Sequence, residues 1–325
     1  MYDTDSSMQQ QAFSDEDNGF LLAIDFGGTK IAMATVTATG QRLHETEIPT
    51  WAEQGADRVL ARMFDAALTL ASKTALDTDG ALLAVAAVTP GIVQPDGIHL
   101  APNNPGWERL ALAARLREGF GVDCVSVATD VKAAALAEAR CGALMGVEYG
   151  LYLNVGTGLA AAPVVGGKVL RGAHGAAGEI GYQLRGVMGE VPFVDGGAPL
   201  ENFISGRALA DRTSALLGRT VTTREAFELA ASMPAVATLI DDALDGLAMH
   251  VANMALLLDP SHIVIGGGMA RVPAVLAAIE AQLERAVPYP PVVAVAAFGK
   301  GAALQGAIAA VMDAWAGHRV QHACQ

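Results

Sequence analysis

The sequence predicts an α/β protein made of two lobes of similar construction. The chain has 325 residues, whereas single hydrophobic cores usually stop growing at about 250–300 residues. Strand-like segments alternate with segments of helical periodicity in both halves, which is typical of α/β folds. In addition, residues 23–36 (AIDFGGTKIAMATV) and 152–165 (YLNVGTGLAAAPVV) share a strand, a turn of Gly and Thr, and a second strand. This internal repeat indicates a duplicated unit.

The composition favours a globular protein and argues against a role with nucleic acid. Hydrophobic residues make up 52% of the chain and charged residues 17%, so there is ample apolar surface to bury. The balance of 21 basic against 34 acidic side chains gives a net charge of -13, which opposes binding to nucleic acid or to an anionic membrane. We therefore expect an anionic ligand to be held by backbone amides, a metal ion and local dipoles rather than by a basic surface.

The cysteines and the first residues predict a cytoplasmic protein. The three cysteines, Cys124, Cys141 and Cys324, have no spacing typical of a disulfide framework or a metal site. Residues 1–18 contain no basic segment followed by an apolar segment, and no apolar run reaches 18 residues. We expect residues 1–18 to be a disordered acidic tail.

The first lobe is predicted over residues 19–129, completed by a last helix at about 300–318. Its predicted elements are strands over 20–25, 31–36 and up to about Pro49, a helix over 57–73, a strand over 81–88, a helix over 108–120 and a strand over 124–130. The second lobe is predicted over 130–299. Its predicted elements are an Ala-rich helix after Asp130, a hairpin over 150–170, a Gly-dense loop to about Pro199, helices over 206–218, 222–232, 236–257 and 271–286, and a short strand over 262–268.

The two repeated turns predict phosphate-binding sites. Glycines in a tight turn allow backbone N–H groups to approach phosphate oxygens, and a threonine adds a hydroxyl. A single Gly-rich hairpin is commonplace, but two in register within a repeat favour the phosphate interpretation. Asp25, just before the first turn, is suited to hold Mg²⁺ directly or through water. The predicted phosphate-binding residues are Gly27, Gly28, Thr29 and Lys30 in the first turn and Gly156, Thr157 and Gly158 in the second.

Two other nucleotide-binding motifs are excluded. No segment matches the P-loop pattern G-x-x-x-x-G-K-[ST]. Residues 156–161 match G-x-G-x-x-A, with Glu179 near the position of a ribose-binding acid, but that motif requires a helix directly after the glycines. Here the chain continues with AAPVVGGKV, which predicts a strand and a turn.

Asp130 is the candidate catalytic residue. It stands between a predicted strand and a predicted helix, where a structural role as helix N-cap would contribute about 1 kcal/mol. The same position, at the end of a strand in an α/β sheet, is where such proteins place ligands. A carboxylate there is suited to accept the proton of a hydroxyl during phosphoryl transfer, and both roles can coexist.

Several further polar residues predict an uncharged, polyhydroxylated substrate. Taken singly, Glu179 and Glu201 would be solvated acids, and Asn103 and Asn104 in APNNPGW would be turn residues. Together they form a set of hydrogen-bonding groups for hydroxyls. The run Gly266-Gly267-Gly268, after a short apolar strand, allows a flat group such as adenine to lie against the backbone, although a tight turn would explain it equally.

The chain resembles the ROK family of sugar kinases, within the actin-like ATPase superfamily, over about residues 20–315. The resemblance is carried by five motifs in order: AIDFGGTKI, APNNPGW, ATDVKAAALAEA, LNVGTGLAAAPVVGGKVLRGAHGAAGEIGY and HIVIGGGMA. It implies a duplicated actin-like (ribonuclease H-like) fold, with two lobes and a cleft between them. It also implies ATP and Mg²⁺ as cofactors, Asp130 as general base, and sugar binding by Asn103, Glu179 and Glu201.

Three departures from the family pattern affect metal and substrate. The family's C-x-C-G-x-x-G-C zinc motif falls between Tyr182 and Glu201, where this chain has no cysteine, so no zinc is expected. Tyr182 replaces the family histidine that ligates the zinc and contacts the sugar, and Thr129 replaces the asparagine before the catalytic Asp. Both stay candidate substrate-binding residues. Because the zinc ligands are lost together, the resemblance implies a zinc-free variant of the family rather than a damaged enzyme.

The predicted function is therefore ATP-dependent phosphorylation of a hexose hydroxyl, glucokinase-like and at the 6-position. The alternatives are a kinase for fructose, mannose, allose or an N-acetylhexosamine, polyphosphate as the donor, or a non-catalytic sugar sensor. A repressor is disfavoured because only about 19 residues precede the first strand and the charge is acidic. A filament-forming actin relative is disfavoured by the retention of Asp25, Asp130 and both turns. We expect a homodimer or homotetramer.

Overall fold

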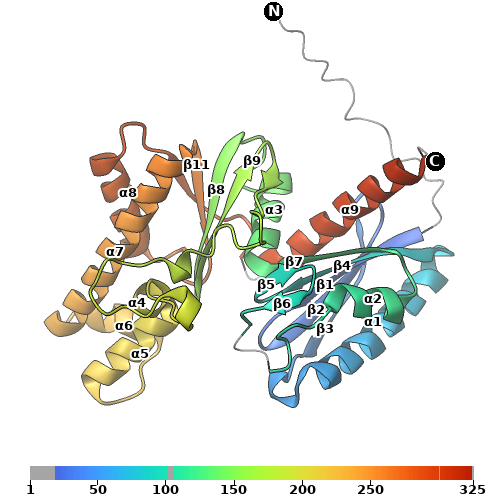
Figure 1. Cartoon of the computed structure of the whole chain (residues 1–325), viewed down its shortest axis with the longest axis horizontal. Helices are drawn as coiled ribbons and strands as arrows, with labels where there is room; N and C mark the ends of the chain where they lie inside the picture. The colour runs from blue at the N-terminus through green and yellow to red at the C-terminus, as the bar shows by residue number, and fades with distance from the viewer. Residues whose placement is uncertain (1–18, 102–104, 300, 324–325) are drawn as a thin grey trace, which may run out of the picture. The chain divides into compact units, whose positions relative to one another are not determined.

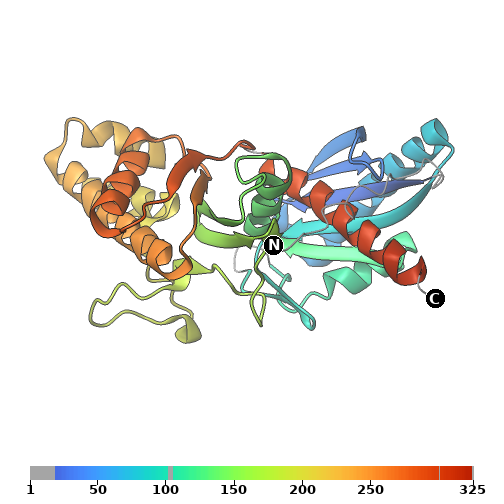
Figure 2. The ribbon, with the colours of Figure 1, turned by 90° about the horizontal axis from the view of Figure 1, so that it is seen from above.

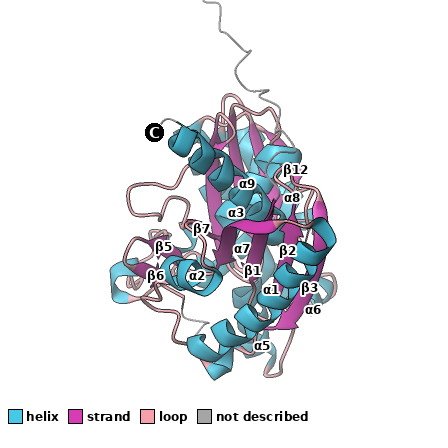
Figure 3. Ribbon diagram, turned by 90° about the vertical axis from the view of Figure 1, so that its right-hand side faces the viewer, coloured by secondary structure: helices cyan, strands magenta, loops and turns pink. Residues whose placement is uncertain are grey.

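The computed structural model describes residues 19–101, 105–299 and 301–323. The chain divides into two compact units (Figure 1): one ends at Thr129 and resumes at Ala307, and the other runs from Asp130 to Gly306. Each contains strands and helices, as Figure 3 shows, so the predicted mixed α/β class is confirmed. No helix in the described part of the chain is long and apolar enough to cross a membrane.

The first unit is built on a five-stranded sheet in the order β3-β2-β1-β4-β7. β1 pairs antiparallel with β2 and parallel with β4, and β4 is parallel to β7. Alternate residues of β1, such as Ile24 and Phe26, pack with α1 and α2 in one core. α9 runs along the other side of this sheet (Figure 1). The elements are β1 (Gly19–Phe26), β2 (Lys30–Val36), β3 (Arg42–Pro49), α1 (Ala56–Thr78), β4 (Ala81–Thr89), β5 (Ile92–Gln94), β6 (Gly97–His99), α2 (Leu112–Phe120), β7 (Cys124–Thr129) and α9 (Ala302–Ala323).

The second unit has a sheet of the same construction, in the order β10-β9-β8-β11-β12. β8 pairs antiparallel with β9 and parallel with β11, as β1 does with β2 and β4. The internal repeat therefore corresponds to two sheets of one topology. The elements are α3 (Asp130–Cys141), β8 (Tyr149–Val155), β9 (Leu159–Val165), β10 (Lys168–Val169), η3 (Ile180–Tyr182), η4 (Phe193–Asp195), α4 (Glu201–Ile204), α5 (Gly206–Leu217), α6 (Thr223–Ala230), α7 (Pro234–Leu258), β11 (His262–Gly266), α8 (Pro273–Ala286) and β12 (Val292–Val295).

Successive side chains of β8 pack on opposite faces of this sheet. Leu151 and Leu153 belong to a core with α7 and α8, whereas Tyr152 packs in a separate cluster with α3. This period of two is the one that extended strands impose. The sheet is thus covered on both faces by helices of its own unit.

Some predicted boundaries differ from those observed. The helix predicted from residue 108 begins at Leu112, because Arg109 adopts a left-handed conformation (φ 59°) that the first turn of a helix excludes. The strand predicted over 262–268 ends at Gly266, and Gly267 turns the chain with φ 89°. The short β5–β6 hairpin and β12 were not predicted, since segments of three or four residues carry little periodicity.

Candidate active site

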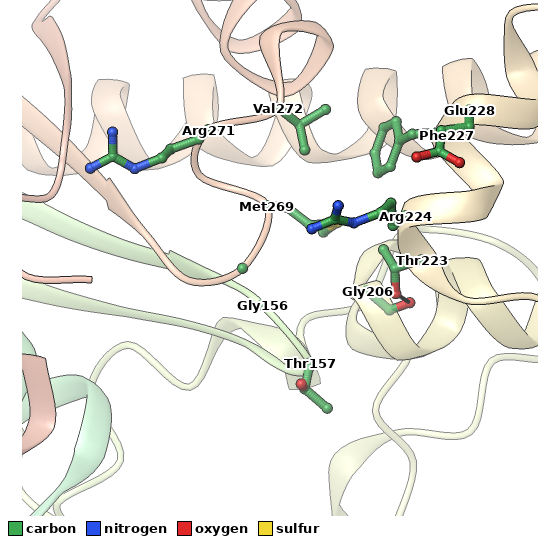
Figure 4. A pocket seen from close by; sticks show the side chains of 11 residues that line it. Gly156, Thr157, Gly206, Thr223, Arg224, Phe227, Glu228, Met269, Arg271 and Val272 are labelled. Carbon is green, nitrogen blue, oxygen red and sulfur yellow. Dashed lines mark hydrogen bonds between the residues drawn. The ribbon is translucent and has the colours of Figure 1, made fainter. Parts of the chain in front are cut away.

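A cavity of about 480 Å³ lies beside the turn that joins β8 and β9 (Figure 4). Its walls come from this turn, the start of α5, one side of α6, and the segment after β11. The cavity brings together Gly156, Thr157 and Gly268, three of the residues predicted to bind nucleotide. The lining residues are Gly156, Thr157, Gly206, Thr223, Arg224, Phe227, Glu228, Gly268, Met269, Arg271 and Val272.

The floor of the cavity is a set of closely packed backbone segments. The N–H of Gly206 donates to the carbonyl oxygen of Gly156 at 2.7 Å, and the Thr223 hydroxyl donates to the carbonyl of Gly206 at 2.7 Å. Gly267 has φ 89°, and a Cβ there would lie 2.5 Å from the Val155 carbonyl oxygen. Only glycine fits this position without displacing the strand. The three-glycine run therefore lets the segment after β11 lie against the β8–β9 turn.

α6 carries the side chains of the opposite wall. Its start is fixed by a capping box, in which the Thr222 hydroxyl accepts from the Glu225 N–H and the Glu225 carboxylate accepts from the Thr222 N–H. The next turns place Arg224, Phe227 and Glu228 on the cavity. In Figure 4 the Arg224 side chain extends from α6 toward Met269.

Two arginines give this cavity a local positive charge. Neither Arg224 nor Arg271 has a hydrogen bond or ion pair with another residue of the described chain. Beside the backbone amides, metal ion and dipoles expected from the sequence, the cavity therefore offers two cationic side chains. Sequence reasoning missed both arginines because net charge averages over the molecule, and because a single cation on a helix or in a turn is usually a solvated surface residue.

A second set of candidate residues gathers around the start of α3. The Lys132 ammonium lies 3.2 Å from a carboxylate oxygen of Glu179, and Lys132 is only 7% exposed. Burial raises the pKa of Glu179, and the charges of Asp130 and Glu201 raise it further, against the lowering effect of Lys132. Asp130, Glu179 and Glu201 are therefore close enough to interact. Lys132 was not predicted.

Asp130 opens α3 and is exposed, with one carboxylate oxygen accepting the Val131 N–H at 2.8 Å. The protein atoms around its carboxyl group nevertheless exclude enough water to raise its pKa. Hydrogen bonds from the Val131 and Asp130 N–H groups and the charge of Lys132 lower that pKa in part. A carboxylate with a raised pKa is a better proton acceptor than an ordinary aspartate.

Glu201, the first residue of α4, links this cluster to the β8–β9 turn. Its carboxylate accepts the Leu159 N–H at 2.9 Å and pairs with Arg207 at 3.1 Å. A Cβ on Gly158 would lie 2.8 Å from the same carboxylate. A side chain at position 158 would therefore displace the end of the Glu201 side chain.

Tyr182, the last residue of η3, is half-buried beside the two glutamates. Burial raises the pKa of its phenol, and the negative charges of Glu179 and Glu201 raise it further. Its ring is stacked on that of Phe193, with 3.7 Å between centroids. The phenol therefore stays protonated at neutral pH and can donate a hydrogen bond.

The predicted residues of the first unit are only partly described. Thr129 is 4% exposed at the end of β7, and its buried hydroxyl has no hydrogen-bond partner among the described residues. Asn103 and Asn104 lie outside the described residues. Further along the same loop, buried Trp107 donates through Nε1 to the Thr89 hydroxyl at 2.6 Å, which anchors the loop's end to β4.

The first Gly/Thr turn, between β1 and β2, is open at Gly28. Thr50 holds it from one side, since its hydroxyl donates to the Gly27 carbonyl at 2.6 Å and its N–H donates to the Thr29 carbonyl at 3.0 Å. A Cβ on Gly28 would meet no atom within 4 Å. Lys30 forms an ion pair with Glu47, and its role in phosphate binding stays a prediction.

The described residues contain no group of three or more His, Cys, Asp or Glu side chains that could hold a metal by themselves. Mg²⁺ in phosphate-transfer sites is bound by one or two carboxylates together with substrate phosphates. Asp25 is half-buried at the end of β1, directly before the open turn, and fits that requirement.

Comparison with known protein families identifies the relatives of this chain. The model of the ROK family matches residues 21–314. The chain belongs to the ROK family. The resemblance drawn from the five sequence motifs is thereby confirmed.

Similar members of the ROK family include several sugar kinases. Kanosamine kinase of Amycolatopsis mediterranei is 32% identical over 89% of this chain and 94% of its own length. A ROK hexokinase from Thermus thermophilus is 32% identical, with a TM-score of 0.76 over 90% of this chain and 98% of that one. A ROK family glucokinase from Streptomyces griseus, solved in complex with glucose and AMPPNP, is 27% identical, with a TM-score of 0.66 over 89% of this chain and 98% of that one.

The similarity extends to a regulator. The xylose repressor of Caldicellulosiruptor bescii is 29% identical over 60% of this chain and 48% of its own length. Family membership by itself therefore does not decide between catalysis and regulation, and the decision falls to the residues of the site.

Proposed function

We propose that this protein transfers the γ-phosphoryl group of ATP to a hydroxyl of a free hexose, with glucose phosphorylated at the 6-position as the first substrate to test. The observation that carries the proposal is the cluster at the start of α3. There, Asp130 with a raised pKa stands near Glu179, which is held by the buried Lys132. A repressor has no need of a basic carboxylate in its sugar site, whereas phosphoryl transfer uses one.

The acceptor side of the reaction is assigned to this cluster. Glu179, Glu201 and the Tyr182 phenol supply acceptors and a donor for hydroxyl groups, with Thr129 and the two asparagines Asn103 and Asn104 as further proposed ligands. Lys132 neutralises Glu179, so that the site can bind an uncharged sugar without repelling the phosphoryl donor.

Asp130 then acts as the general base. As the sugar hydroxyl oxygen bonds to the γ-phosphorus, the bond from that phosphorus to the β,γ-bridging oxygen breaks, and ADP leaves. The hydroxyl proton passes to the Asp130 carboxylate. In a loose transition state the base takes the proton late, so part of its contribution is the orientation of the hydroxyl.

The donor side is assigned to the cavity beside the β8–β9 turn. Phe227, Met269 and Val272 offer apolar contact for adenine, and the glycines of residues 266–268 let the base lie against the backbone. Gly156, Thr157 and Gly158, and in the other unit Gly27, Gly28 and Thr29, offer N–H and hydroxyl donors to phosphates. Mg²⁺, held by Asp25 and the phosphates, would neutralise charge on the leaving group.

The direct test is a coupled assay of ADP release over glucose, mannose, fructose, allose and N-acetylated hexosamines, with ATP and with polyphosphate as donors. The proposal expects hexose-dependent ADP release that is abolished in Asp130→Asn. Sugar binding without ADP release in the wild-type protein would favour the second candidate, a non-catalytic sugar sensor.

Because the donor is ATP, the proposed location of the protein is the cytoplasm. Its assembly into a homodimer or homotetramer stays a prediction.

A further inference from the structure

The segment between Tyr182 and Glu201 lies where ROK proteins have their zinc motif, and its residues do not fit a zinc ion. Residues 183–200 contain neither cysteine nor histidine, and zinc sites are built from cysteine thiolates, histidine nitrogens and a few carboxylates. At the position of the family's histidine ligand stands an aromatic ring, and that ring is in contact with another ring.

We propose that the stacked pair of Tyr182 and Phe193 replaces the metal, so that Phe193 is a positioning residue that holds the Tyr182 hydroxyl in the hexose site. This inference rests on the proposed function for its effect on catalysis. The stack itself is a property of the fold and can be tested separately.

The two rings close the loop between η3 and η4. Their centroids are 3.7 Å apart with 20° between the planes. The Tyr182 side is rigid, because Ile180 and Gly181 of η3 are buried and a Cβ on Gly181 would lie 2.8 Å from the Leu159 carbonyl oxygen. The backbone of Tyr182 is thus fixed on β9, and the stack on Phe193 keeps the Tyr182 ring from rotating away.

Polar contacts fold the rest of the loop onto the helices of the same unit. Arg185 pairs with Glu190 at 2.7 Å, and its guanidinium stands 4.1 Å over the Phe203 ring of α4. Nearby, the side-chain oxygen of Gln183 lies 3.0 Å from Nδ1 of His250 on α7. These contacts secure the first half of the loop, residues 183–190. The stack holds the second half of the loop, residues 191–200. Figure 2 shows the loop as a yellow-green segment that projects from the side of the unit.

The Tyr182 hydroxyl is available for a ligand. No hydrogen bond joins it to any residue that the structure describes, and Glu179 and Glu201 are near enough to raise its pKa. A protonated phenol beside two carboxylates offers one donor among several acceptors, which suits a sugar hydroxyl. A rotation of the ring about χ1 would remove that donor from the site.

The test compares Phe193→Ala with Phe193→Tyr, which keeps an aromatic ring, and with Val194→Ala as a matched control on an exposed neighbour. Val194 is 90% exposed. Loss of an aromatic pair predicts a rise of about two- to tenfold in KM for the hexose in Phe193→Ala. We expect kcat and KM for ATP to change by less than twofold, Phe193→Tyr to restore the hexose KM, and Val194→Ala to behave as wild type.

A readout independent of activity is hydrogen exchange of the backbone amides of residues 191–199, followed by mass spectrometry. Opening of this half of the loop predicts faster exchange there in Phe193→Ala than in wild type and in Val194→Ala. If wild type phosphorylates no hexose, the proposed function fails, while hydrogen exchange still tests whether the stack holds the loop. Unchanged exchange, an unchanged hexose KM, or an equal effect on the KM of both substrates would overturn the inference.

Discussion

The ammonium group of Lys132 lies 3.2 Å from a carboxylate oxygen of Glu179, and the two side chains are 8% and 21% exposed. A buried ion pair contributes little relative to an apolar pair of equal shape, but removal of one partner leaves a buried charge uncompensated. The pair therefore offsets the cost of burying the Glu179 carboxylate and adds little to the stability of the fold.

We predict that Lys132→Met lowers the free energy of unfolding by about 3 kcal/mol at pH 7. The folded-state pKa of Glu179 is already raised by burial, and loss of Lys132 raises it further. A carboxyl whose folded pKa lies above its unfolded pKa favours the folded state at low pH and loses that advantage as pH rises. The loss of unfolding free energy in the variant should therefore become smaller as the pH is lowered. Urea unfolding at several pH values measures this loss, and the double variant Lys132→Met, Glu179→Gln should recover much of it.

A second prediction concerns the glycine behind the donor cavity. Gly267→Ala introduces both a Cβ 2.5 Å from the Val155 carbonyl oxygen and strain at φ 89°, whereas Gly218→Ala, at φ 66°, meets no atom within 4 Å. Backbone strain alone costs about 1 kcal/mol. We expect Gly218→Ala to lose only stability, and Gly267→Ala to raise KM for ATP as well. Equal kinetics in the two variants would show that close packing at Gly267 has no role in donor binding.

A third prediction tests the charge in the same cavity. Arg224 reaches from α6 toward Met269 (Figure 4) and forms no hydrogen bond or ion pair with the described residues. Loss of a hydrogen bond to a charged group costs about 1.5–3 kcal/mol, so Arg224→Met should raise KM for ATP about tenfold or more and leave the hexose KM unchanged. Arg285→Met, an exposed change on α8, is the control. Steady-state kinetics with each substrate varied decides between these outcomes.

A fourth prediction concerns zinc. With no cysteine or histidine between Tyr182 and Glu201, the purified protein should contain no stoichiometric zinc, and its activity should survive a zinc-selective chelator when Mg²⁺ is in excess. Metal analysis by mass spectrometry checks this directly. One tightly bound zinc per chain would contradict it.

The duplicated fold could be predicted because its signals are local and repeat. Glycines mark the turns of the β1–β2 and β8–β9 hairpins, and the apolar runs before them have the length of buried strands. Arg109, by contrast, ends up in a left-handed conformation that no local signal announces, so the start of α2 was misplaced. Boundaries of this kind are decided by tertiary packing.

The residues that the sequence did not reveal are those whose role depends on partners far along the chain. Lys132 looks like a solvated lysine on an Ala-rich helix until Glu179 is seen beside it, 47 positions later. Phe193 lies in a loop without periodicity, and only the fold stacks it on Tyr182. Asp130, Glu179 and Glu201 were found because acids next to glycines and at strand ends are unusual. Their roles in catalysis stay predictions.

The pH dependence of activity follows from the raised pKa of Asp130. A general base must be deprotonated, so kcat/KM should fall as pH drops through that pKa, at a higher pH than an ordinary aspartate gives. Protein stability should respond in the opposite sense, because a carboxyl with a raised folded pKa disfavours the folded state once it is ionised. Asp130→Asn should therefore melt no earlier than wild type at pH 7. A melting temperature several degrees lower would indicate that the carboxylate is structural.

The measurement that tests the central claim most directly is the turnover of Asp130→Asn in the ADP-release assay with the preferred hexose. Asn is nearly isosteric with Asp and caps a helix equally well, but it cannot accept the proton of the attacking hydroxyl. Loss of a positioned general base lowers the rate by about 10²–10⁴-fold. We predict a fall in kcat of at least about a hundredfold, with the melting temperature and hexose binding retained. Turnover within about tenfold of wild type, in protein of unchanged melting temperature, would contradict the assignment of Asp130 as the base.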